Sequence, residues 1–159
     1  MAKVGKPGSK LFKLEDWWAV WIGLFVCLLG FGNVLFGTEF LGWVVKVNVW
    51  TSLGKSLGTV SKSFEGLTGF GAMVITYIFM LAITTIGAFV MGKNVKRFMI
   101  GFTIIFWLTN ACMILGSYAY IGASPDKLEA LKIPWSLGLG EIGLIFAMIV
   151  GLLIGNFFP

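Results

Sequence analysis

Few residues in this chain are suited to chemistry, and three of them lie inside or beside long apolar segments. Glu141 is the one carboxylate well inside a segment apolar enough to cross a membrane. An acid in the bilayer costs about 3 kcal/mol or more, so Glu141 is a candidate functional group, here for proton coupling. The alternative is that the last span begins after it, because the 18 residues from Ile142 to Pro159 can nearly cross a membrane by themselves.

Asn110 and Asn156 place amides in apolar surroundings, one mid-way along a predicted span and one near the end of another. Asparagine in lipid needs a hydrogen-bond partner, so these residues either bond across helices or line a site for a small anion. Neutral donors suit an anion because they replace its hydration shell. An ionised Glu141 would repel such a substrate, which makes it a better proton carrier than a direct ligand. Thr84 and Ser117 are expected to serve helix packing.

The chain lacks the side chains of common enzyme and metal sites. It has no histidine, the commonest general base and metal ligand. Cys27 and Cys112 lie in separate apolar segments without ligand spacing, which predicts buried small side chains and no disulfide. The G-x-G-x-x-G match at 138–143 opens an apolar span and follows no predicted strand, so it does not indicate nucleotide binding. We therefore expect no enzyme activity, no metal and no cofactor.

Small residues recur every four positions in the last apolar segment, at Gly143, Ala147, Gly151 and Gly155. This spacing places them on one face of a helix, where they allow a second helix backbone to approach closely. The pattern predicts either ordinary helix packing or the sliding or broken helix of a transporter.

The composition requires lipid as the solvent for most of the chain. Apolar residues make up 58% of the 159 residues and charged residues 12%, against about 45–50% and about 25% in soluble domains. A small domain buries only about two-thirds of its surface, too little to hide this excess. The net charge is +5, but the basic residues lie in short gaps between apolar segments. They indicate membrane topology and contact with anionic headgroups rather than nucleic acid.

The uncharged segments predict an all-α integral membrane protein with about four transmembrane helices. Each segment is long enough to cross a hydrocarbon core of about 30 Å. A polar, basic N-terminal tail over 1–13 precedes a single membrane domain over 14–159. The spans are expected at about 17–38, 68–91, 98–122 and 135–158.

Residues 39–65 differ from the spans, because they are interrupted by charges and partly alternate in polarity. A lone strand cannot cross lipid, since its backbone groups would be unpaired. The pattern therefore predicts an interfacial or re-entrant segment anchored by Trp43 and Trp50, followed by a loop from Thr51 to Ser63.

The distribution of basic residues predicts the orientation. The tail and the turn at 92–97 hold seven lysines and arginines, and the two opposite loops hold five. Short basic loops favour the cytoplasmic side, and the turn at 92–97 is the most compact of these segments. We expect both termini to be cytoplasmic.

Four segments carry a resemblance to a known family. The start, LEDWWAVWIGL at 14–24, resembles the block that opens the bacterial sulfate exporter family. Supporting matches are KVNVWTS at 46–52, GKNVKRFMIGF at 92–102 and GLLIGN at 151–156. The first block is the most specific, and the matches extend over residues 14–159.

The resemblance implies one half of an inverted-repeat secondary transporter in the bacterial inner membrane. Family members usually carry a second set of spans, so the chain is expected to be a half-transporter. The resemblance implies transport of a small anion, with sulfate and organosulfur compounds as the candidates. Its expected partners are the lipid bilayer and either a second copy or a companion membrane subunit, because such sites form between repeats. Asn156 falls within a matched motif. The alternative function is a structural or accessory subunit of a larger membrane complex.

Overall fold

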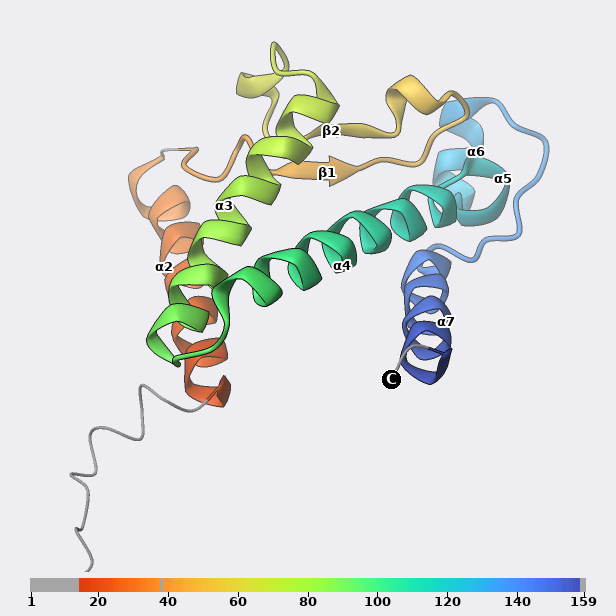
Figure 1. Cartoon of the computed structure of the whole chain (residues 1–159). Coiled ribbons are helices and arrows are strands. Elements are labelled where there is room, and N and C mark those ends of the chain that lie inside the picture. Colours follow the sequence, from red (N-terminus) through yellow and green to blue (C-terminus); the bar gives the residue numbers. More distant parts are fainter. Residues whose placement is uncertain (1–14, 38, 158–159) are drawn as a thin grey trace, which may run out of the picture.

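A computed structural model describes residues 15–37 and 39–157 (Figure 1). The basic tail expected over 1–13 lies outside these residues. Three helices of 22 residues each, α2 (Glu15–Phe36), α3 (Gly69–Val90) and α4 (Val95–Gly116), are long and apolar enough to cross a membrane. Each extends about 33 Å at 1.5 Å per residue. A fourth apolar helix, α7 (Ile142–Phe157), has 16 residues. The all-α membrane fold predicted from the sequence is confirmed.

The long helices run alternately up and down. Figure 1 shows the first turn of α2, the α3–α4 turn and the last turn of α7 at the lower end of the molecule. The two strands and the short helices α5 (Ala119–Gly122) and α6 (Pro125–Leu131) lie at the upper end. Helix α4 is strongly tilted, so it and α3 form a V that opens toward the upper end.

The turn between α3 and α4 is fixed by local chemistry. Gly92 has a φ of +72°, a left-handed conformation that glycine adopts without steric cost. Asn94 then caps α4, because its side-chain oxygen accepts a hydrogen bond from the Arg97 N–H at 3.2 Å. The turn can therefore be short, and its basic residues stay close together.

Residues 39–65, expected to be an interfacial or re-entrant segment and a loop, contain a small hairpin whose second strand lies within the expected loop. Strand β1 (Val45–Val47) pairs antiparallel with β2 (Leu57–Thr59), with Lys46 opposite Gly58. The Val45 N–H donates to Thr76 Oγ1 on α3 at 3.0 Å. Short 3-10 turns at Leu53–Lys55 and Lys62–Phe64 replace parts of the expected loop. The hairpin crosses the open end of the V between α3 and α4 (Figure 1).

Helix α4 ends at Gly116, six residues before the boundary expected for the third span. Trp50 from the hairpin segment binds here: its N–H donates to the Ser117 oxygen, and its own oxygen accepts from the Ala119 N–H at 2.9 Å. The Trp50 ring N–H also donates to the Ile114 oxygen at 2.8 Å. These bonds give the backbone after Gly116 partners outside the helix, so the helix does not continue.

Helix α7 begins later than the span expected from about 135. The preceding segment is extended, and its Leu137 and Leu139 N–H groups donate to Tyr120 and Ile121. Gly138 in this segment has a φ of +67°, which a helix excludes. Bonding to the α5 region and this left-handed glycine together delay the helix to Ile142.

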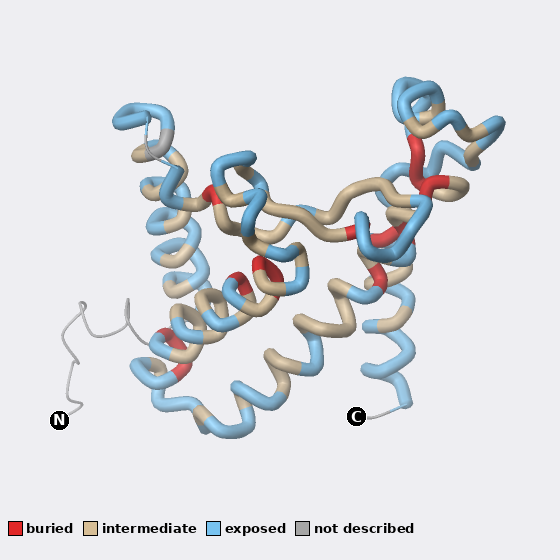
Figure 2. The backbone as a smooth tube through the Cα atoms, turned by 90° about the horizontal axis from the view of Figure 1, so that it is seen from above, coloured by how far each residue is buried: buried red, intermediate tan, exposed pale blue. Residues whose placement is uncertain are grey.

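The interior is small. Among the described residues, the buried apolar side chains are mostly alanine, with Met73 and Cys112 the larger ones. Figure 2 shows that exposed and half-buried backbone dominates the long helices. Phe36 at the end of α2 is 76% exposed. Such surfaces are compatible with a hydrocarbon environment and with contacts to further membrane helices.

Candidate functional site

The three polar residues singled out in the sequence are not brought together. Asn110 lies in the second half of α4 and is half-buried, and its amide nitrogen donates to the Phe106 oxygen at 2.9 Å. Asn156, in the last turns of α7, is exposed and donates to the Leu152 oxygen at 3.0 Å. Each amide thus bonds its own helix four residues back. Among the described residues, neither amide makes a bond to a second helix.

Glu141 lies immediately before α7 and is exposed. Its backbone oxygen accepts from the Leu144 N–H at 3.0 Å. This arrangement agrees with the alternative prediction, in which the last helix begins after Glu141. Ile142 and Asn156 are separated by ~21 Å along the axis of α7, so Glu141 and Asn156 stand at opposite ends of one helix.

The small-residue stripe of α7 is divided between two environments. Gly143 is buried against α4: a Cβ atom there would lie 3.0 Å from the Met113 Cα atom. Gly151 and Gly155 are exposed, and an added Cβ atom at either would meet nothing within 4 Å. Helix packing therefore explains the first glycine of the stripe, and the other two face outward from the described part of the chain.

A polar bridge between α3 and α4 was missed in the sequence. The Tyr77 hydroxyl and Thr103 Oγ1 are 2.7 Å apart, and either can be the donor. Tyr77 also packs against the rings of Phe106 and Trp107, with centroids 5.3 and 5.9 Å away. The available signal was a tyrosine and a threonine inside otherwise apolar spans. The bridge holds the middle of the V together.

Threonine hydroxyls on α3 differ in how they are satisfied. Thr84 donates to the Met80 oxygen of its own helix at 2.7 Å. Thr76 donates to the Ala72 oxygen and accepts from Val45. The Thr85 hydroxyl is buried and has no partner among the described residues. A buried hydroxyl normally has a partner, so Thr85 is an exception among the described residues.

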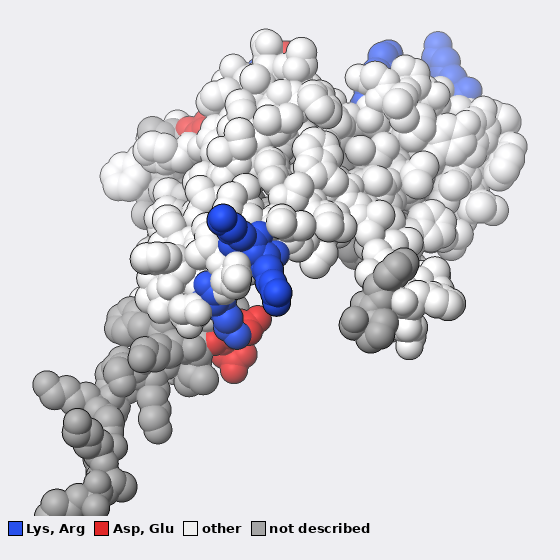
Figure 3. Space-filling model, in the orientation of Figure 1, with Lys and Arg blue, Asp and Glu red and all other residues white. Residues whose placement is uncertain are grey.

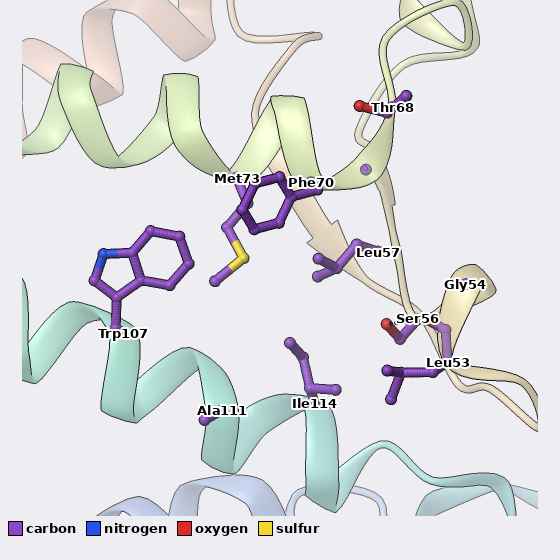
Figure 4. A pocket seen from close by; sticks show the side chains of 11 residues that line it. Leu53, Gly54, Ser56, Leu57, Thr68, Phe70, Met73, Trp107, Ala111 and Ile114 are labelled. Atoms are coloured by element: carbon purple, nitrogen blue, oxygen red, sulfur yellow. Dashed lines mark hydrogen bonds between the residues drawn. The ribbon is translucent and has the colours of Figure 1, made fainter.

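An apolar hollow lies in the V between α3 and α4, beside the hairpin (Figure 4). It has a volume of about 490 Å³ and an almost wholly apolar lining. Phe70 and Met73 of α3 face Trp107 and Ile114 of α4 across it, and Leu57 projects from the hairpin. Three segments distant in the sequence build this cavity, which is why no local pattern indicated it.

Charged groups gather at the two ends of the molecule. Basic side chains form a cluster near the lower end in Figure 3, where the α3–α4 turn carries Lys93, Lys96 and Arg97. At the upper end, Ser61 donates to the Glu39 carboxylate at 2.6 Å. Hydrogen bonds from Ser61 and Ser63 hold the pKa of Glu39 below its ordinary value. This carboxylate therefore stays ionised in mildly acidic solution.

Three long apolar helices and a shorter fourth define the chain as a multi-pass membrane protein. It is similar to the UPF0324 membrane protein NE0724 of Nitrosomonas europaea, with 35% identity over 153 residues. The matched region is 94% of this chain and 31% of that protein, so the chain spans about a third of the length of this curated relative. No family model and no solved structure matches the chain.

Proposed function

We propose that the chain is a half-transporter for a small anion, sulfate or an organosulfur compound among the candidates. It works in the bacterial inner membrane with a second copy or a companion subunit. The observation that carries the proposal is the state of the two amides. Asn110 and Asn156 lie on apolar helices and satisfy only one N–H each, within their own helix. The remaining donor and acceptor of each amide are available to a substrate or a facing helix.

The separation of the polar groups supports a site shared between subunits. Asn156 and Glu141 stand at opposite ends of α7, and most of the apolar surface of the long helices is uncovered. In inverted-repeat transporters the substrate binds where two repeats meet, so one set of helices supplies only part of the site. The relative, about three times as long as the matched region, has room for a second set of helices.

Glu141 takes the role of a proton carrier in this proposal. It is exposed at the start of α7, so it can exchange protons with water before α7 enters the apolar layer. An ionised carboxylate would repel an approaching anion, and protonation removes that repulsion. Proton and anion fluxes are then linked at Glu141.

The test is anion flux into proteoliposomes across a range of pH, with radiolabelled sulfate as the first probe. Asn156→Ala is expected to reduce flux at every pH, because a donor is lost. Glu141→Gln is expected to retain flux but to flatten its pH dependence. Leu153→Met is the matched control on α7 and should behave as wild type. Wild-type flux in both polar variants would refute the roles given to these residues.

The second candidate function is that of an accessory membrane subunit. The exposed Gly151 and Gly155 face of α7 favours it, because such a face accommodates another helix closely. Co-purification of a larger complex from the native membrane, together with absence of anion flux by the isolated chain and by that complex, would select this function over transport.

A further inference from the structure

The apolar cavity in the V has a polar neighbour on the other side of the hairpin. This second hollow, of about 450 Å³, is lined by both strands and by the segment that leads into α3. The lysines Lys46 and Lys62 supply its positive charge, and Glu65 supplies one negative charge. Leu57, Thr68 and Gly69 line both hollows. The apolar and the basic hollow are therefore adjacent.

The boundary between the hollows is closely packed. Gly69 packs so closely on the Leu57 backbone that a Cβ atom would collide with it. Thr68 caps α3 at the same point by accepting from the Gly71 N–H at 3.2 Å. A ligand that uses both hollows must therefore pass over this boundary, with an apolar part on one side and a polar part on the other.

The location of the pair restricts the ligand further. The apolar cavity lies between α3 and α4, two of the helices long enough to cross a membrane, and it is close to their upper ends. The hairpin lies beside the first turns of α3, where the Val45 N–H bonds Thr76, and near the upper end of α4 (Figure 1). The transition from apolar to basic lining thus lies near the upper ends of two helices long enough to cross a membrane, the level at which headgroups are expected.

We infer that the two hollows together bind one anionic phospholipid. An acyl chain occupies the apolar cavity beside Met73, Trp107 and Ile114, and the phosphate-bearing headgroup contacts Lys46 and Lys62. The volume of the apolar cavity is within the range of small-ligand sites, roughly 300–1,000 Å³. Each lysine near a membrane surface attracts anionic headgroups, and Glu65 weakens this attraction without cancelling two positive charges. The inference does not depend on the transport proposal.

A soluble anion would use only the basic hollow, and an apolar small molecule would use only the other. The choice of ligands in a binding experiment distinguishes these two alternatives from the lipid. The full chain is reconstituted with dioleoyl phosphatidylglycerol or dioleoyl phosphatidylcholine, and retained lipid is measured by native mass spectrometry. Glycerol phosphate is added as a soluble competitor. We expect at least about tenfold tighter retention of phosphatidylglycerol, with no displacement by glycerol phosphate at equal concentration.

Two sets of variants test binding of the lipid headgroup and binding of the acyl chain separately. Lys46→Gln combined with Lys62→Gln is expected to lower phosphatidylglycerol retention about tenfold and to leave phosphatidylcholine retention unchanged. Its matched control is Lys93→Gln with Lys96→Gln, which removes the same charge at the α3–α4 turn, among residues that line neither hollow. Ala111→Phe, which fills the apolar cavity, is expected to lower retention of both lipids. Ala82→Phe on α3, outside the residues that line the cavity, is its control.

The melting temperature of each variant in detergent verifies that it is folded, and Glu65→Gln gives an independent check because it should tighten phosphatidylglycerol binding. Equal loss in the two lysine double variants would mean unspecific charge attraction and would overturn the inference. Displacement by glycerol phosphate would assign the basic hollow to soluble anions instead. Undiminished lipid retention in Ala111→Phe would show that no acyl chain occupies the apolar cavity. That result would also overturn the inference.

Discussion

Gly116 and Gly143 bring the end of α4 and the start of α7 into backbone contact. A Cβ atom on Gly116 would lie 2.5 Å from the Gly143 Cα atom, closer than side-chain carbons are found. Helices cross this closely only where both lack side chains. The crossing ties α7 to the rest of the described chain.

We predict that Gly116→Ala destabilises the protein by about 1–3 kcal/mol, the usual cost of an overfilled contact. The backbone of α7 has to move, because a backbone atom rather than a flexible side chain blocks the added methyl group. The measurement is thermal unfolding in detergent. Gly151→Ala is the control: nothing lies within 4 Å of its added methyl group, and alanine has the higher helix propensity. Equal melting temperatures for the two variants would contradict the close crossing.

A larger residue at Gly151 tests assembly rather than folding. No described atom lies within 4 Å of an added Cβ at Gly151. Gly151→Leu should therefore change the free energy of unfolding of the monomer by no more than about 0.5 kcal/mol. If α7 forms the proposed contact with a second copy or a companion subunit, the same variant should lose the oligomer. Mass measurement in mild detergent shows the outcome, with Leu153→Met as control. A complex retained at wild-type yield would place the contact elsewhere.

The sequence predicts the number and approximate positions of the apolar helices because hydrophobic length is a local property. The ends of α4 and α7 are not local. They depend on Trp50 binding to Ser117 and Ala119, and on Leu137 and Leu139 bonding to the α5 region. No window of neighbouring residues contains these partners.

The hairpin escaped prediction for a related reason. Strand β2 is only Leu57–Thr59 and has a glycine at its centre, so its intrinsic strand preference is weak. Its place is set by β1 and by the close approach of Gly69 on α3. The candidate polar residues were locatable from sequence alone, because amides and acids are rare in apolar segments. Their i to i−4 bonding and the cavity between α3 and α4 required the structure.

Trp50 is predicted to be the main link between the hairpin and α4. Trp50→Phe removes the hydrogen bond from the ring N–H to the Ile114 oxygen and keeps an aromatic ring against Tyr118. One such bond contributes about 1 kcal/mol net, and the melting temperature should fall accordingly. Trp135→Phe is the matched control: the Trp135 ring contacts Tyr120 and is 55% exposed. An equal fall in melting temperature in the two variants would show that the size of the aromatic side chain, not the hydrogen bond, stabilises this contact.

The hydrogen bond between Ser61 and the Glu39 carboxylate is predicted to make the stability of the protein depend on pH in acid. Its pKa is lowered in the folded protein by hydrogen bonds from Ser61 and Ser63. A depressed folded pKa adds stability that is present above the unfolded value of about 4.3 and is lost as the pH falls through the folded value. Ser61→Ala should therefore weaken the dependence of stability on pH below about 4.3.

Glu39→Gln separates this effect from the second role of Ser61, whose side chain also accepts from the Ser63 N–H at 3.1 Å. The glutamine variant keeps that bond but cannot titrate, so its stability should vary less with pH than that of wild type. Thermal unfolding between pH 3 and pH 6 measures both variants. The same acid dependence in wild type and Glu39→Gln would rule out Glu39 as the titrating group.

The orientation of the molecule is predicted from the α3–α4 turn. Lys93, Lys96 and Arg97 lie within six residues, and Gly92 with the Asn94 cap holds them in a compact turn at the lower end of the molecule. Compact basic segments are retained on the cytoplasmic side. The first turn of α2 and the last turn of α7 lie at the same end, so they share that side. The opposite end, with Lys55 in the hairpin segment, should then face the periplasm.

Cysteine labelling in intact cells measures this orientation. Lys93→Cys and Lys55→Cys are made separately in a background in which Cys27 and Cys112 are replaced by alanine. Both lysines are exposed, and neither is needed for a helix cap, so the fold should be kept. An impermeant maleimide should label Lys55→Cys from outside and reach Lys93→Cys only after the cells are opened. The reverse pattern would invert the topology, and it would place the basic turn, with the start of α2 and the end of α7, on the outer face.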